Sequence, residues 1–162
     1  MSIAGSINEQ TFKALFENTV FLSAITSWFM AQCLKTAIFL LRSKRRSARE
    51  ALETLTWRTG GMPSSHSALM GSLATAIALK QGFASDLFIV TVFFALVVMR
   101  DAMGIRRSSG LQARNLNSLG RAAAEKLSIE YHPVKEIQGH APIEVIVGAL
   151  LGIFISAAFT YL

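Results

Sequence analysis

The sequence contains few charged residues for its length. Only 16% of its 162 residues are Asp, Glu, Lys or Arg, whereas about 25% is usual in a soluble domain. Hydrophobic residues make up 52% of the chain. This scarcity of charge argues against a soluble enzyme and favours an integral membrane protein.

Cysteine is also scarce, and repeats are absent. The single cysteine, Cys33, lies in an apolar run and excludes a disulfide within the chain. The first 18 residues are polar and mixed in charge, so we expect no cleavable signal peptide. Without repeats or low-complexity segments, residues 1–162 are expected to form one membrane-embedded domain.

Four apolar stretches organise the chain, at residues 19–41, 67–80, 86–103 and 142–162. A membrane span needs about 20 apolar residues, which the first, third and fourth stretches provide. The second is short and rich in Ala, Gly and Ser, and small side chains suit close packing inside a bundle. We therefore expect an all-α bundle of about four transmembrane helices.

The positive charge is concentrated in two polar stretches, residues 42–58 and 106–139. They contain twelve of the sixteen Lys and Arg residues of a chain whose net charge is +6. The positive-inside rule places both stretches in the cytoplasm and both termini on the opposite face. Residues 111–127 have near-helical apolar spacing and predict an interfacial amphipathic helix. The expected partner is the bilayer rather than nucleic acid.

The segment Gly-Gly-Met-Pro-Ser-Ser-His-Ser at residues 60–67 is a loop that leads into a helix. Its two glycines and its proline exclude a regular helix, and the sequence becomes Ala-rich from Ala68. The N-terminus of a helix binds anions, because its first N–H groups lack partners and its dipole favours negative charge. His66 at this junction is able to donate a proton near neutral pH. The segment predicts a phosphate site.

Further ionisable residues fall at the same ends of the predicted spans, namely Lys35, Arg100, Asp101, Arg106, His140 and Glu144. Charged groups are costly in membrane segments and mark functional sites. His140 and Glu144 are four residues apart and share one helix face. A carboxylate bound to one imidazole nitrogen leaves the other nitrogen nucleophilic. Two histidines, several cations and a helix N-terminus indicate phosphoryl transfer.

Three segments, residues 60–68, 100–107 and 139–148, resemble the divergent branch of the type 2 phosphatidic acid phosphatases (PAP2). These membrane proteins are related to acid phosphatases and vanadium haloperoxidases. The resemblance covers residues 20–160. It implies a PAP2-like helical bundle and hydrolysis of a lipid phosphomonoester without a metal or other cofactor.

The first PAP2 motif is Lys, six residues, then Arg-Pro. Lys35 and Arg42 fit this spacing, with Ser43 in place of the proline. The resemblance implies that Lys35 and Arg42 contact the phosphate. Arg58, just before the glycines, is an alternative to Arg42.

The second motif is Pro-Ser-Gly-His, which Pro63-Ser64-Ser65-His66 matches with serine for glycine. The resemblance implies that Ser64, Ser65 and nearby backbone N–H groups bind phosphate, with Gly61 shaping the loop. It makes His66 the general acid.

The third motif is Ser-Arg, five residues, His, three residues, Asp. His140 and Glu144 fit its second half, which makes His140 the nucleophile and Glu144 its orienting partner. Val134 stands where the motif has arginine. We expect Arg106 to replace that arginine and Asp101 to pair with an arginine of the site.

The expected substrates are phosphatidylglycerol phosphate or phosphatidic acid. Three alternatives remain open: a polyprenyl diphosphate phosphatase, a non-catalytic protein that binds an anionic lipid headgroup, and a metal-dependent hydrolase that uses Asp101 and Glu144. Gly148 and Gly152 form a small-residue pair that packs helices together, within the chain or in a homodimer.

Overall fold

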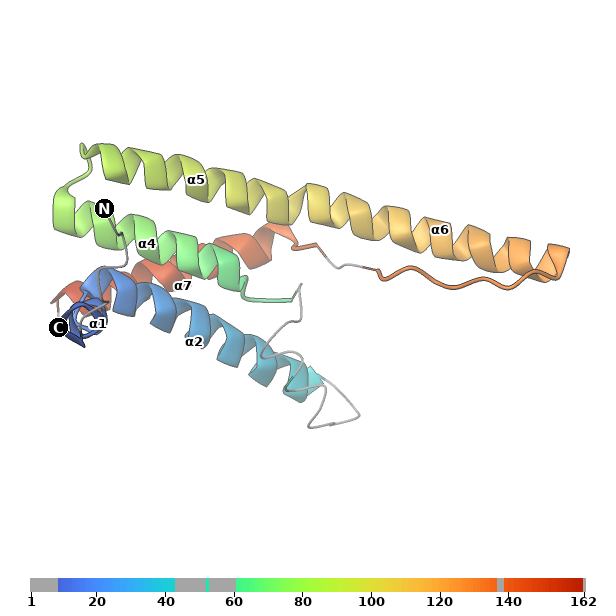
Figure 1. The fold of residues 1–162 in the computed structure, drawn as a ribbon, viewed down its shortest axis with the longest axis horizontal. Coiled ribbons are helices and arrows are strands. Elements are labelled where there is room, and N and C mark those ends of the chain that lie inside the picture. Colours follow the sequence, from blue (N-terminus) through green and yellow to red (C-terminus); the bar gives the residue numbers. More distant parts are fainter. Residues whose placement is uncertain (1–8, 43–51, 53–60, 137–138, 162) are drawn as a thin grey trace, which may run out of the picture.

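The computed structural model describes residues 9–42, 52, 61–136 and 139–161, and its regular elements are all helices. They are α1 (Glu9–Phe16), α2 (Thr19–Arg42), α4 (Ser65–Gln81), α5 (Asp86–Met103), α6 (Ile105–Leu127) and α7 (Pro142–Tyr161) (Figure 1). The predicted all-α fold is confirmed, and the four apolar stretches correspond to α2, α4, α5 and α7. Helix α1 lies in the N-terminal segment, where the sequence predicts no element.

Serine and glycine set the turn between α4 and α5. Helix α4 ends at Gln81 and is followed by Gly82, whose φ of +88° lies in the left-handed region that favours glycine. Ser85 then caps α5, because its Oγ accepts from the N–H of Phe88 at 3.3 Å. The two helices therefore follow one another with only a short loop between them.

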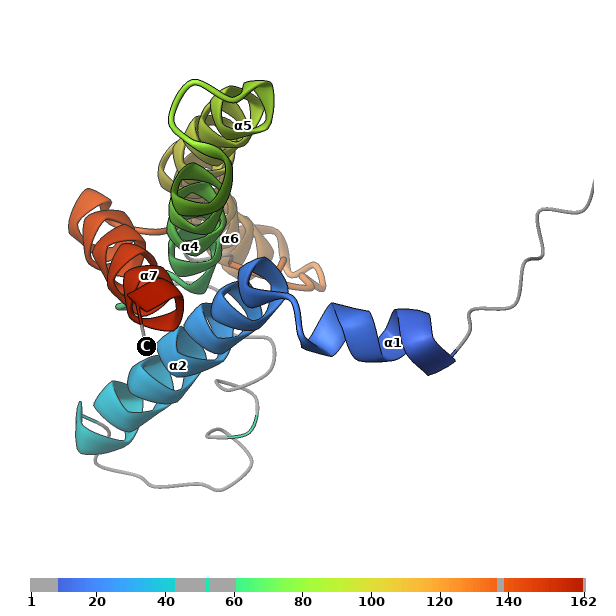
Figure 2. The same cartoon turned by 90° about the vertical axis from the view of Figure 1, so that its left-hand side faces the viewer.

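Helix α4 is the centre of the bundle. It packs against α2, α5 and α7, and Figure 2 shows these three helices arranged around it. Its contact with α7 is close because Gly148 lies against the backbone of Ser64, and Gly152 lies against that of Ala68. The glycine pair thus packs helices within the chain and is not available for a dimer interface. The homodimer itself stays a prediction.

Within the described residues, three helical segments are long and apolar enough to cross a membrane: Thr19–Leu41, Asp86–Leu127 and Pro142–Tyr161. Helix α5 exposes large apolar side chains such as Phe93, Phe94 and Val97, as expected of a surface that faces lipid. Helix α4 has 17 residues and lies among the other helices. The helical membrane bundle is confirmed, whereas the count of four spans stays a prediction.

Helix α6 continues the line of α5 beyond the bundle, and the return segment, residues 128–136, runs back beside it (Figure 1). It begins at Ile105, earlier than the predicted residue 111, and ends at Leu127, as predicted. Ser128 follows in the left-handed conformation, with φ of 53°. Leu116, Leu119 and Leu127 are exposed, so the predicted amphipathic helix is present. Its position at the membrane interface stays a prediction.

Candidate phosphate site

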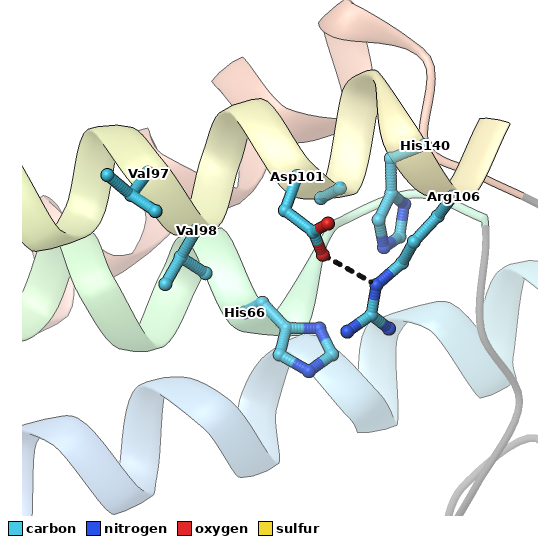
Figure 3. A pocket seen from close by; sticks show the side chains of 7 residues that line it. His66, Val97, Val98, Asp101, Arg106 and His140 are labelled. Atoms are coloured by element: carbon cyan, nitrogen blue, oxygen red, sulfur yellow. Dashed lines mark hydrogen bonds and ion pairs between the residues drawn. The ribbon is translucent and has the colours of Figure 1, made fainter. Parts of the chain in front are cut away.

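Four of the predicted site residues line one cavity of about 330 Å³ (Figure 3). Its lining consists of His66, Val97, Val98, Asp101, Ala102, Arg106 and His140. These residues come from the start of α4, the end of α5, the start of α6 and the residues before α7. The cavity therefore forms where four segments meet at one end of the bundle, and the fold brings the two histidines together.

His140 is held in one orientation by Glu144. The His140 Nδ1 lies 2.9 Å from the Glu144 Oε2, and only 4% of His140 is exposed. The His140 N–H donates to the carbonyl of Ala102 at 3.0 Å, which fixes the backbone against α5. The predicted contact between residues 140 and 144 is thus present, but the predicted shared helix face is wrong, because His140 lies before α7 begins at Pro142. Because Nδ1 is engaged, Nε2 is the nitrogen left for chemistry.

The start of α4 presents donors beside His66. Ser64 is fully buried, and its Oγ accepts from the N–H of Ser67 at 3.4 Å and from the Ser67 hydroxyl at 3.0 Å. The Ser64 N–H donates to the carbonyl of Glu144 at 3.0 Å and so joins α4 to α7. In the described part of the chain, the N–H groups of Ser65 and His66 have no acceptor. They remain free to bind an anion.

Arg106 lies in the cavity with its guanidinium partly free. Its Nε donates to the Asp101 Oδ2 at 2.9 Å, so the predicted pairing of Asp101 with an arginine is present. Figure 3 shows the Arg106 guanidinium between the imidazoles of His66 and His140. Since Asp101 occupies only Nε, the two terminal amino groups can bind a phosphate oxygen each.

Lys35 is buried near the loop that precedes α4 and does not itself line the cavity. Only 5% of its surface is exposed, and its aliphatic chain packs against the loop, with Cγ 3.6 Å from where a Cβ on Gly61 would stand. Gly61 has a φ of +87°, a conformation that strains any other residue. Lys35 is close enough to interact electrostatically with Glu144 and His66. A buried ammonium at this position favours an anion in the cavity.

The arginine candidates differ in what the structure shows of them. Arg106 lines the cavity. Arg42 is the last residue of α2, and its side chain lies outside the described residues, as does the whole of Arg58. Val134, at the position of the missing motif arginine, is exposed beside α6. Among the described residues, Arg106 is therefore the arginine placed to complete the site.

Asp101 and Glu144 belong to separate pairs, with Arg106 and His140 respectively. Across the described ranges, no three His, Cys, Asp or Glu side chains gather as a metal site would require. The donor set therefore does not fit the metal-dependent alternative. Metal independence itself stays a prediction.

Sequence reasoning missed Arg107 and Asn117. Arg107 lines a second, polar cavity of about 240 Å³ together with Gly61, Gly110, Leu111, Arg114, Glu136, Gly139 and Glu144. Asn117 is buried between α6 and the return segment. The sequence shows Arg106 and Arg107 as neighbours, but it does not indicate that their side chains line different cavities. A buried asparagine among exposed residues had no sequence signal.

The chain is similar to a family described as the divergent PAP2 family, whose sequence model matches residues 16–155. It is also 37% identical over 160 residues to the "Uncharacterized membrane protein YuiD" of Bacillus subtilis (strain 168). That alignment covers 91% of this chain and 97% of the relative. No solved structure matches the chain.

Proposed function

The chain belongs to the divergent PAP2 family, and from this we propose that it hydrolyses a phosphomonoester on a membrane lipid. The observation that carries the proposal is the shared cavity of His66, Arg106 and His140, with Glu144 bound to the His140 Nδ1. A buried lysine and a helix N-terminus add positive potential beside it. This is the set of groups that transfer of a phosphoryl group needs.

In the proposed mechanism, the His140 Nε2 attacks phosphorus and the bond to the lipid oxygen breaks. His66 gives its proton to the departing lipid alcohol, and a phosphohistidine forms. Water then attacks the phosphohistidine, His66 takes a proton from that water, and inorganic phosphate leaves. Lys35, Arg106 and the first N–H groups of α4 stabilise the negative charge on the phosphoryl oxygens in both steps.

The proposed substrate class follows from the position of the site. Phosphatidylglycerol phosphate and phosphatidic acid carry a terminal phosphate on a lipid that stays in the bilayer. The basic stretches at this end of the bundle favour the cytoplasmic face, where such lipids are made. Polyprenyl diphosphates of the outer face fit this orientation less well.

The test is release of phosphate from defined lipid phosphates by the purified protein in detergent micelles. We expect His140→Ala to reduce the rate by roughly 10²- to 10⁴-fold or more, because it removes the nucleophile. His132→Ala is the matched control, since this histidine is exposed on the return segment. With ³²P-labelled substrate, an acid-labile adduct should form on the native protein and not on His140→Ala.

A non-catalytic role in binding lipid headgroups is the second candidate, because Val134 replaces the arginine of the third motif. It predicts that lipid phosphates bind to the native protein and that no phosphate is released. Equal rates for the native protein and His140→Ala would contradict the proposed phosphatase.

A further inference from the structure

Helix α6 is described over its whole length, and Asn117 is the residue of this helix that is buried. Only 2% of its surface is exposed, although most of the helix faces outward. A buried asparagine is costly unless its donors and acceptor are satisfied. The groups that satisfy Asn117 all belong to the return segment.

Both ends of the Asn117 amide bind that segment. Its Nδ2 donates to the carbonyl of Val134 and to the Glu136 Oε1, each at 2.9 Å. Its Oδ1 accepts from the Tyr131 hydroxyl at 2.8 Å and from the N–H of Val134 at 2.9 Å. One side chain therefore binds both backbone groups of Val134 and holds three residues of the return segment.

We call the hydrogen bonds of Asn117 to Tyr131, Val134 and Glu136 the clamp. Two glycines allow the chain after α6 to come close enough to α6 for these bonds to form. The ring of Tyr131 lies against Gly120, where a Cβ would overlap it. Gly139 lies against the backbone of Arg107, where a Cβ would overlap the Arg107 nitrogen. The return segment thus contacts α6 at Gly120, beyond Asn117, and Gly139 contacts the same helix at Arg107, before Asn117.

The clamped residues lie close in the sequence to the catalytic histidine of the proposed function. The residue after Gly139 is His140, whose N–H is bound to Ala102 of α5. Glu136 is the charged residue that Asn117 binds. The hydrogen bond from Asn117 holds the pKa of this exposed carboxyl below its usual value, and the nearby Arg114 contributes in the same direction. At neutral pH Glu136 is therefore an ionised acceptor for Asn117.

We propose that Asn117 is a positioning residue, which locks the return segment on α6 and thereby sets the place of His140 in the cavity. This proposal rests on the proposed function for its kinetic consequence and on geometry alone for its structural one. The position of the missing motif arginine, Val134, is held by this asparagine and contributes no side chain to the cavity.

Asn117→Asp is the sharpest variant because it keeps the shape of the side chain. The carboxylate still accepts from Tyr131 and Val134, but it has no N–H to donate and it repels Glu136. Tyr131→Phe removes one hydrogen bond and keeps the ring on Gly120. Asn115→Ala is the matched control, since Asn115 is an exposed asparagine of the same helix.

The first readout needs no reaction. Protein labelled with ¹⁵N at its three histidines gives imidazole shifts that report the hydrogen bond of the His140 Nδ1. We expect Asn117→Asp to change the signals of His140 and of His132, which lies on the return segment itself, and to leave those of His66 nearly unchanged. Tyr131→Phe should produce a smaller change in the same direction, and Asn115→Ala none.

The second readout is kinetic. Because misplacement of a reacting group lowers the rate of the chemical step, Asn117→Asp should reduce kcat on the order of 10- to 100-fold with KM nearly constant. If the native protein releases no phosphate, the proposed function fails and the histidine signals alone decide the positioning role. Native-like signals in Asn117→Asp, or unfolding of both Asn117→Asp and Tyr131→Phe, would overturn the positioning role.

Discussion

At the scale of single residues, the site is built from pairs that leave one functional group free. Glu144 binds the Nδ1 of His140 and leaves Nε2, while Asp101 binds the Nε of Arg106 and leaves two terminal amino groups. Each carboxylate fixes a side chain without occupying the atoms that a phosphate would meet. The pairs also lower the net charge of the site, which eases its placement at the end of a membrane bundle.

Arg106→Lys should weaken substrate binding, because lysine cannot bind Asp101 and two phosphate oxygens at once. A lost hydrogen bond between charged groups is worth about 1.5–3 kcal/mol, so we expect KM to rise about tenfold or more. Arg121→Lys is the control, since Arg121 is exposed on α6 and lines neither cavity. Steady-state kinetics on phosphatidic acid micelles provide the measurement. Equal KM values for the two variants would show that Arg106 does not contact the phosphate.

At the scale of elements, the close contact between α4 and α7 positions both histidines. The Ser64 N–H is bound to the carbonyl of Glu144, so the start of one helix is tied to the first turn of the other. Gly148 and Gly152 allow this approach because they carry no side chain against α4. The distance between His66 and His140 is therefore set by helix packing.

Gly152→Ala should destabilise the bundle, because a Cβ there would overlap the carbonyl oxygen of Ala68 and lie 2.8 Å from the Ser72 nitrogen. Overpacking of this kind costs about 1–3 kcal/mol. We expect a lower midpoint of thermal unfolding in detergent. Ile146→Ala, on the exposed face of α7, is the control and should unfold close to the native temperature. A native midpoint for Gly152→Ala would mean that α4 and α7 are less closely packed.

At the scale of the whole molecule, the site and the α4–α5 turn lie at opposite ends of the bundle (Figure 1). The two basic stretches are connected to the site end, where α2 and α5 finish and α4 and α7 begin. A bundle with this polarity has one orientation in the membrane that agrees with the positive-inside rule. The cytoplasmic placement of the site is an expectation at this scale.

Cysteine labelling tests the orientation, because Cys33→Ser leaves a chain without cysteine. In that background, Ser109→Cys on α6 and Ala84→Cys in the α4–α5 turn provide exposed sites at the two ends. With an impermeant maleimide on intact cells, we expect Ala84→Cys to react at once. Ser109→Cys should react only after the membrane is permeabilised. The reverse pattern would place the site on the outer face.

The sequence by itself determined the helical membrane fold and most helix boundaries. The length of an apolar run and the composition of the loops around it are local properties that can be read directly from the sequence. The runs at residues 19–41, 86–103 and 142–162 therefore predicted α2, α5 and α7 closely. The contact of His140 with Glu144 was likewise predicted, but α7 begins at Pro142, so His140 meets the Glu144 carboxylate from the residues before the helix and not from a shared helix face. Helix α1 was missed, since its eight residues carry no long apolar run.

Only the tertiary structure decided which distant groups meet. Arg106 and Arg107 are neighbours in the sequence, yet they line different cavities because adjacent residues point to different sides of α6. The role of Asn117 depends on a return segment that packs back on the same helix, and no local pattern encodes such a contact. Local propensity sets the helices, whereas the environment of a side chain depends on packing between segments far apart in the chain.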